Sequence, residues 1–124
     1  MKIIYFFFFS AFFSNAVADW KEINRDDEKI YFVETNMIIP HLEGRRMAKE
    51  LHELFNTLDD GTTSLRIRSE YNCKTGATRI LTMDSVAGEM GVGKIVALQD
   101  KPTDWKLVKS GDSRLKILNF VCEQ

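Results

Sequence analysis

The sequence is poor in the residues that build metal and nucleophile sites. Its 124 residues include only two cysteines and two histidines, and His41 and His52 lack the HxxH or HExxH spacing of zinc sites. No GxSxG segment occurs, and no serine has an evident histidine and acid partner. We therefore expect no catalytic residues, no metal and no cofactor, with the two histidines at solvent-exposed or edge positions.

A strong charge of one sign is also missing. The formal net charge is −1 at pH 7, so the chain has no overall field that would concentrate nucleic acid or an anionic membrane surface. Beyond residue 13, no apolar run approaches the ~20 residues that a membrane-spanning helix needs. We expect neither a nucleic-acid partner nor stable membrane insertion of the folded domain.

The one long apolar run lies at the N-terminus. Lys2 precedes a nearly unbroken apolar stretch that ends at Phe13, and the small residues Ala16-Val17-Ala18 precede Asp19. This pattern is typical of a secretory signal peptide, and the stretch is too short for a membrane anchor. We predict a signal peptide over residues 1–18, cleaved after Ala18.

The predicted mature chain, residues 19–124, is long enough for one domain and too short for two. Cleavage removes one of the 17 basic residues and none of the 18 acidic ones, so the mature charge stays close to neutral. No cysteine stands at the cleavage site, so we do not expect a lipoprotein. We expect an exported protein, either periplasmic or secreted and associated with the cell surface.

Cys73 and Cys122 are the only cysteines, and export favours a disulfide between them. In the chain-entropy description, closing a loop of this length stabilises a domain by roughly 4 kcal/mol. The alternative is a Cys–His nucleophile with His41 or His52. It would need a free thiolate in an oxidising compartment.

The residues between predicted turns favour an antiparallel sheet. Residues 65–73 alternate between an apolar and a polar face, and Lys74-Thr75-Gly76 turns the chain into a returning strand over residues 79–86. Parity in this hairpin places Leu65, Ile67, Tyr71, Leu81 and Met83 on one face, and Arg66, Arg68, Glu70, Asn72, Thr82 and Asp84 on the other. Further strands are predicted over residues 20–23, 30–33 and 94–98, with a short extension at 107–108.

The C-terminal segment has the spacing of an amphipathic helix. Leu115, Leu118, Val121 and Cys122 fall on one side of it, and either Ser110 or Asp112 can cap it. A bond from Cys122 to Cys73 would fasten the apolar stripe of this helix to the sheet. The face that carries Tyr71 is then the face that the helix covers.

Two segments are ambiguous. Residues 45–58 have apolar residues at helical spacing and a composition that favours helix, but no good N-cap precedes them. Residues 88–94 match a phosphate-binding loop up to its final hydroxyl, where Ile95 stands instead. Because a strand-like segment follows and an exported protein meets no ATP, we predict a glycine turn between two strands and no nucleotide.

Taken in order along the chain, these segments resemble the surface-adhesin protein E family of bacterial envelope proteins. The residues that carry the resemblance are Trp20, Tyr31, Ser69-Glu70-Tyr71-Asn72-Cys73, Arg79-Ile80-Leu81, Met90-Gly91-Val92-Gly93, Trp105 and Phe120-Val121-Cys122. The resemblance implies an α+β fold. A curved antiparallel sheet of about six strands carries a C-terminal helix on its concave face, tied by the disulfide. It also implies a strand over residues 51–56, where the family usually has Trp in place of His52.

Two functions remain open. In the first, which the resemblance implies, the chain is an exported, non-enzymatic binding module for a protein partner such as a host matrix or serum protein. Its contact residues are then predicted to be Arg66, Arg68 and Glu70 on the polar face of the hairpin, although a solvated face with no partner is the alternative reading. In the second, the chain is a periplasmic housekeeping or structural protein of the envelope with no host ligand. A homodimer is left open.

Overall fold

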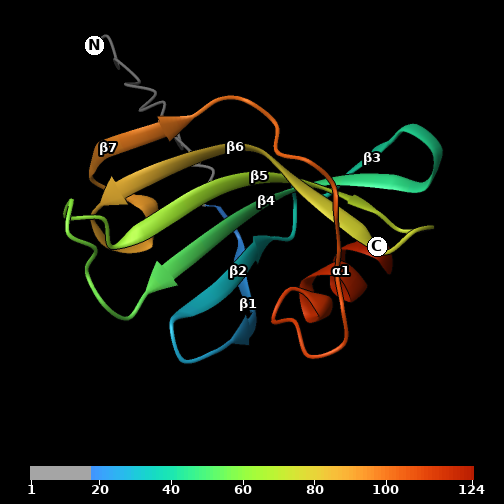
Figure 1. Ribbon diagram of the computed structural model, residues 1–124, viewed down its shortest axis with the longest axis horizontal. Helices are drawn as coiled ribbons and strands as arrows, with labels where there is room; N and C mark the ends of the chain where they lie inside the picture. Colours follow the sequence, from blue (N-terminus) through green and yellow to red (C-terminus); the bar gives the residue numbers. More distant parts are fainter. Residues whose placement is uncertain (1–17) are drawn as a thin grey trace, which may run out of the picture.

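Within residues 18–124, one antiparallel sheet and one C-terminal α-helix make up the fold (Figure 1). The computed structural model describes residues 18–124, so the predicted signal peptide lies outside the described residues apart from Ala18. The main strands follow the order β1-β2-β4-β5-β6-β7 across the sheet. They are β1 (Trp20–Arg25), β2 (Lys29–Glu34), β4 (Arg45–Leu54), β5 (Ser64–Asn72), β6 (Ala77–Ala87) and β7 (Lys94–Gln99).

Short elements complete the sheet and its connections. β3 (Ile39–His41) pairs with β4, and β8 (Lys106–Leu107) pairs with β6. Two single turns of 3₁₀ helix, η1 (Leu42–Gly44) and η2 (Glu89–Gly91), precede β4 and β7. The α-helix, α1, spans Leu115–Cys122. The predicted α+β fold and its strands are confirmed. None of the helices among residues 18–124 is long and apolar enough to cross a membrane.

Alternate residues of the β5–β6 hairpin lie on opposite faces of the sheet, as their parity predicted. The face that carries Tyr71 packs against α1 and is named the helix face; the face that carries Arg66 and Arg68 is named the open face. One residue departs from the prediction. Arg68 pairs with Thr82 while Ser69 pairs with Ile80, so a bulge inserts Leu81 between them. Leu81 therefore lies on the open face, beside Met47 and Arg68, and its predicted place on the helix face is wrong.

Residues 45–54 form β4 in spite of their helix-favouring composition. β4 lies between β2 and β5. It pairs with β5 along nearly all of its length, with β2 over Glu50–Leu54 and with β3 over Arg45–Met47. A central strand gains backbone hydrogen bonds and side-chain packing from two neighbours, and this outweighs differences in intrinsic propensity of a few tenths of a kcal/mol per residue. The strand that the resemblance implied from residue 51 is confirmed, although it begins earlier, at Arg45, and ends at Leu54.

The core lies between α1 and the helix face. Ile117, Leu118 and Val121 of α1 pack against Val33 and Tyr71 of the sheet, and most of these side chains are fully inaccessible. The predicted disulfide is confirmed: Cys73, just after β5, is bonded to Cys122 at the end of α1. At the other end of the helix the N-cap residue is Arg114 and no side chain caps it, so the predicted cap at Ser110 or Asp112 is wrong. The Asp112 carboxylate instead accepts a hydrogen bond of 2.9 Å from the Arg114 backbone N–H, in the loop before the helix.

The predicted glycine turn between β6 and β7 is also confirmed. A Cβ atom on Gly88 would lie 1.9 Å from the Val92 carbonyl oxygen, and one on Gly93 would lie 2.2 Å from the Ala87 carbonyl oxygen. The two backbone segments approach too closely for any side chain. Steric fit therefore accounts for these glycines, and β7 follows them as an extended strand.

Candidate functional site

The three residues predicted to contact a partner all lie on β5, but their surroundings differ. The Arg66 Nη2 atom lies 3.0 Å from the Asp84 Oδ2 atom, in a pair that is about one-third exposed. Arg68 is exposed and has no ion pair within the part of the chain that the structure describes. Glu70 is only 1 % exposed, so its carboxylate cannot itself meet a partner.

Two adjoining hollows open on this face. The first is apolar, has a volume of about 90 Å³, and is lined by Met37, Ile39, Met47, Ala48, Lys49, Arg68 and Leu81. The second is polar, has a volume of about 230 Å³, and is lined by Lys49, Arg66, Ile67, Arg68, Thr82 and Asp84. Lys49 and Arg68 stand between the two hollows and belong to both. The open face thus presents a small apolar depression beside a basic, hydrogen-bonding one.

Glu70 organises a cluster of cationic side chains at the end of the open face near β3. Its Oε1 atom accepts hydrogen bonds from Arg79 and lies 4.0 Å from the Arg45 Nη1 atom. Its Oε2 atom lies 3.5 Å from the His41 Nε2 atom. Both guanidinium groups lie within cation–π distance of the Trp105 ring, with Arg45 5.3 Å and Arg79 4.8 Å from its centroid. Buried Glu70 therefore positions the arginines.

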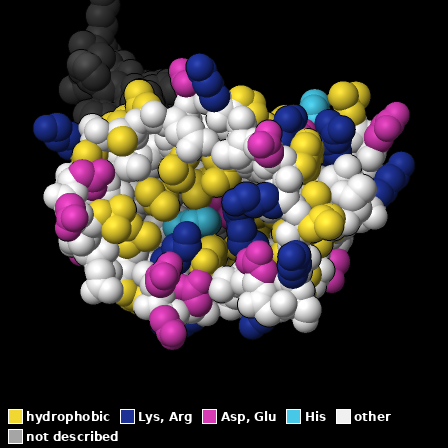
Figure 2. All heavy atoms as spheres, viewed as in Figure 1, with side chains coloured by type: hydrophobic (Ala, Val, Ile, Leu, Met, Phe, Trp, Pro, Cys, Tyr) yellow, Lys and Arg dark blue, Asp and Glu magenta, His cyan; other side chains and the backbone are white. Residues whose placement is uncertain are grey.

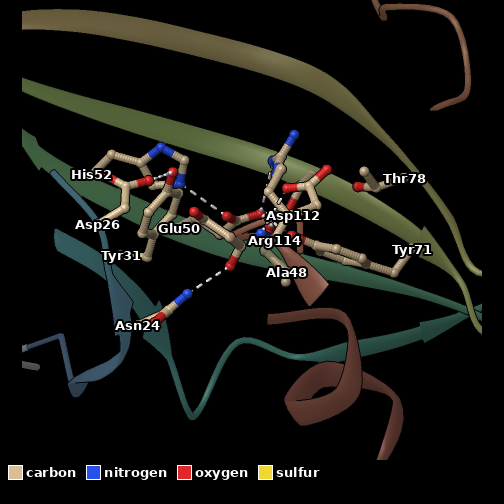
Figure 3. A network of polar contacts seen from close by, with 12 residues as sticks. Asn24, Asp26, Tyr31, Ala48, Glu50, His52, Tyr71, Thr78, Asp112 and Arg114 are labelled. Carbon is tan, nitrogen blue, oxygen red and sulfur yellow. Dashed lines mark hydrogen bonds and ion pairs between the residues drawn. The ribbon is translucent and has the colours of Figure 1, made fainter. Parts of the chain in front are cut away.

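A second polar network lies on the helix face, beside the start of α1 (Figure 3). Glu50, at the middle of β4, is fully buried and receives donors from several elements. The Tyr71 hydroxyl donates to its Oε2 atom over 2.7 Å, Ser69 makes a short hydrogen bond to the same oxygen, and the Arg114 Nη2 atom lies 3.6 Å away. Arg114 precedes α1, so this carboxylate joins the start of the helix to the centre of the sheet.

His52 belongs to the same network, and its predicted exposed or edge position is wrong. It is 2 % exposed, its Nε2 atom lies 3.0 Å from the Glu50 Oε1 atom, and its ring meets that of Tyr31 edge to face at 4.6 Å. Figure 2 looks onto the helix face, where apolar, basic and acidic side chains lie close together near the centre of the view. Figure 3 labels His52 next to Glu50. The other histidine, His41, is exposed on β3.

Burial determines the ionisation of this network. Burial alone would raise the pKa of Glu50, but the hydrogen bond from His52 and the charge of Arg114 outweigh it and lower that pKa to about 2. Burial lowers the pKa of His52 more than Glu50 raises it. The neutral ring also fits the geometry, because the Nδ1 atom is buried without a hydrogen-bond partner and a second proton there would be unpaired.

The arrangement holds the fold and does not present a nucleophile. The Ser69 hydroxyl is inaccessible and donates to Glu50 instead of to the imidazole, so the His52 ring is not placed to take its proton. No group of three or more His, Cys, Asp or Glu side chains within residues 18–124 is arranged to hold a metal ion.

Neither cluster was predicted from the sequence. The signal for the helix-face network was the alternation of Ala48, Glu50 and His52, which share one face once residues 45–54 are known to be a strand. Arg114 was not identifiable, because it stands in a loop far along the chain from Glu50. The signal for the open-face cluster was the lone Trp105, which the resemblance included without giving it a role.

Comparison with known proteins agrees with the fold. The surface-adhesin protein E family matches residues 20–123. Crystal form II of Haemophilus influenzae protein E has 14 % sequence identity and a TM-score of 0.64, over 87 % of this chain and 97 % of that chain. Another structure of Haemophilus influenzae protein E has 11 % identity and a TM-score of 0.65, over 88 % of this chain and 87 % of that one.

At these identities the structural likeness shows the shared fold alone. No curated protein sequence matches this chain. The family match, in contrast, covers all of the residues that form the sheet, α1 and the disulfide. On that match, the chain belongs to the surface-adhesin protein E family.

Proposed function

We propose that this chain is an exported, non-catalytic protein-binding module and that its partner docks on the open face of the sheet. The observation that carries the proposal is the pair of adjoining hollows, one apolar and one polar, that share Lys49 and Arg68. Protein interfaces combine an apolar centre with hydrogen-bonding groups around it, and arginine is enriched in them. The helix face offers less, because α1 already packs over its apolar side chains Tyr31, Val33, Ala48 and Tyr71.

The family supports the same role. Its name describes a surface adhesin, and residues 1–18 have the pattern of a secretory signal peptide. A host matrix or serum protein is therefore the partner that we propose to test first. Within the predicted contact set, Arg66 and Arg68 are the direct contacts, and Glu70 acts through the arginines that it holds.

The test compares the mature domain, residues 19–124, with the double variant Arg66→Glu, Arg68→Glu. Both proteins are passed over purified host matrix and serum proteins and over an envelope extract, by surface plasmon resonance at two salt concentrations. We expect slower association and weaker salt dependence in the variant, because exposed charges act mainly on the rate of encounter. The matched control, Lys109→Glu with Lys116→Glu, reverses two exposed charges away from the hollows.

Circular dichroism must show that both double variants stay folded. Equal binding by the parent and the Arg66, Arg68 variant would overturn the open face as the docking site. Capture of envelope components alone, with no host protein bound, would instead favour a periplasmic housekeeping role. Fractionation with surface proteolysis of intact cells then distinguishes the two locations.

A further inference from the structure

The Arg45–Trp105–Arg79 stack on the open face has more positive charge than its one internal counter-ion can balance. Both guanidinium groups are charged at all physiological pH values, and Glu70 supplies a single negative charge. Glu43 and Asp104 lie near the stack in sequence, but neither forms an ion pair with these arginines in the described part of the chain. Lys74 adds a further positive charge beside Gly44, next to Arg45.

Several N–H donors of Arg45 and Arg79 are not used by Glu70. Arg79 uses Nε and Nη2 on the same Glu70 oxygen, and the Nη1 atom of Arg45, at 4.0 Å, is too far from it for a hydrogen bond. The Arg45 side chain is 33 % exposed and that of Arg79 is 27 % exposed, so the remaining N–H groups can meet solvent or a ligand. Guanidinium donors of this kind match the two oxygens of a carboxylate.

The positions of these donors are largely fixed before any partner arrives. Cation–π contact holds both guanidinium groups against the Trp105 ring. Glu70, buried beneath them, restrains Arg79 further. Side chains held in this way lose less conformational entropy on binding than free surface arginines do.

The neighbouring apolar hollow narrows the class of ligand. His41 pairs with Arg45 across β3 and β4, and Ile39 pairs with Met47 two residues further along the same strands. Both pairs face the same side, and two residues along a strand span roughly 7 Å. That is also the distance between side chains i and i+2 of an extended peptide, so one peptide can place an acid on the stack and an apolar side chain in the hollow.

We propose that the Arg45–Trp105–Arg79 stack is a receptor for an acidic side chain of the protein partner, supplied by an extended segment with an apolar side chain two residues away. The inference rests on the proposed function, since it assigns the partner's chemistry at the same face. A sulfated glycan would meet the arginines, but it has no group for the hollow of Ile39, Met47 and Leu81.

The test uses short synthetic peptides with Leu and Glu at positions i and i+2, and the same peptides with Gln in place of Glu. Binding is followed by ¹⁵N NMR through the two indole N–H signals, those of Trp20 and Trp105, which the variant Trp20→Phe assigns. The Glu peptide should move the Trp105 signal and leave that of Trp20 in place. Equal binding by the Gln peptide, or an unmoved Trp105 signal, would refute the proposal.

Arg45→Gln is the matched variant, because it removes one cation and leaves Glu70 paired with Arg79. This variant should weaken binding of the Glu peptide by about five- to tenfold, the loss typical of a charge-assisted contact. Arg25→Gln, an exposed arginine on β1, should bind as the parent does. Tighter binding of heparin than of the Glu peptide, with the same dependence on Arg45, would assign the stack to a glycan and overturn the acidic-peptide proposal.

The two proposals fail in different ways. If the Arg66, Arg68 double variant loses a protein partner that Arg45→Gln keeps in full, the proposed function stands and the acidic receptor is refuted. If Arg45→Gln weakens both the Glu peptide and the captured protein, both proposals are supported. If neither variant loses binding, the open face is not the docking site, and the acidic-receptor proposal is refuted as well.

Discussion

The imidazole of His52 lies 3.0 Å from the carboxylate of Glu50, and both side chains are almost completely shielded from water. The same carboxylate lies 3.6 Å from Arg114, at the start of α1. One buried anion therefore joins the central strand to the base of the helix. The first two predictions follow from this relationship.

Replacing Glu50 with Gln should destabilise the domain by about 3 kcal/mol, because a buried guanidinium loses its counter-ion while the volume of the side chain is kept. The control is Glu22→Gln, which breaks the exposed pair with Arg25 and should change the free energy of unfolding by less than about 0.5 kcal/mol. Urea titration of both variants measures the difference. Equal midpoints for the two would contradict a structural role for the buried pair.

The free energy of unfolding should fall as the pH is lowered. His52 should cause the loss in an upper pH range, and Glu50 should contribute to it in a lower one. His52 has a lowered pKa in the fold, so the unfolded chain binds the proton more readily as the pH drops below about 6.5, and stability declines from there. Glu50 has a pKa lowered from 4.5 to about 2, so its contribution is present above pH 4.5 and is lost as the pH falls towards 2.

The variants His52→Gln and Glu50→Gln separate these steps. The first should reduce the slope of the unfolding free energy between about pH 6.5 and 4.5, and the second should reduce it between 4.5 and 2. Some slope should remain in the lower range, because the hydrogen bond from Tyr31 also lowers the pKa of Asp26. Denaturant titrations at a series of pH values provide the profile. If His52→Gln leaves the upper part of the slope unchanged, the neutral buried imidazole is not its source.

Replacing both Cys73 and Cys122 with Ser should cost up to roughly 4 kcal/mol, the value that chain entropy gives for a loop of this length. Thiol titration of the native protein should find no free thiols in the absence of a reductant. An unchanged unfolding midpoint in the double variant would show that the packing of α1 alone holds the helix in place.

Gly88→Ala should destabilise the domain by about 3 kcal/mol, because the new methyl group would meet the Val92 carbonyl and force a backbone shift. Gly61→Ala is the matched comparison. A Cβ there meets no atom within 4 Å, and the cost of its positive φ is about 1 kcal/mol. Thermal unfolding of the two variants measures the difference, and a milder effect at Gly88 than at Gly61 would be inconsistent with the close approach.

The exported protein should begin at Asp19. In the structure, Asp19 already belongs to the fold, since its carbonyl accepts a hydrogen bond of 3.1 Å from the Thr35 backbone N–H and its carboxylate accepts one from the Thr35 hydroxyl. Cleavage after Ala18 would leave these contacts intact. Intact mass or N-terminal sequencing of protein recovered from the envelope decides the point, and a chain that retains Met1 would contradict it.

The hairpin of β5 and β6 shows how far local pattern carries a prediction. Alternation placed Ile67, Tyr71 and Met83 on one face, because the side-chain period of a strand is fixed at two. It misplaced Leu81, because a bulge adds one residue to one strand and leaves no mark in the alternation. Pairing with neighbouring strands likewise makes β4 a strand, although its composition alone favoured a helix.

The two polar clusters could not be predicted from the sequence, for a different reason. Glu70 looks like a solvated strand residue until Arg79 and Arg45 are known to close over it. His52 looks like an ordinary surface histidine until Glu50 and Tyr31 are known to pack against it. Contacts between residues distant in the chain determine both outcomes, and no periodic pattern records them.

The position of the disulfide has a consequence for a protein exposed to proteases. The bond joins the end of β5 to the end of α1, so β6, β7, β8 and the helix all lie within one covalent ring. A single cut in an exposed part of that ring, such as residues 100–102, severs the backbone without detaching either piece. Such a nicked molecule keeps its helix and its central strands until a reductant breaks the disulfide, which is then the only covalent link between the two pieces.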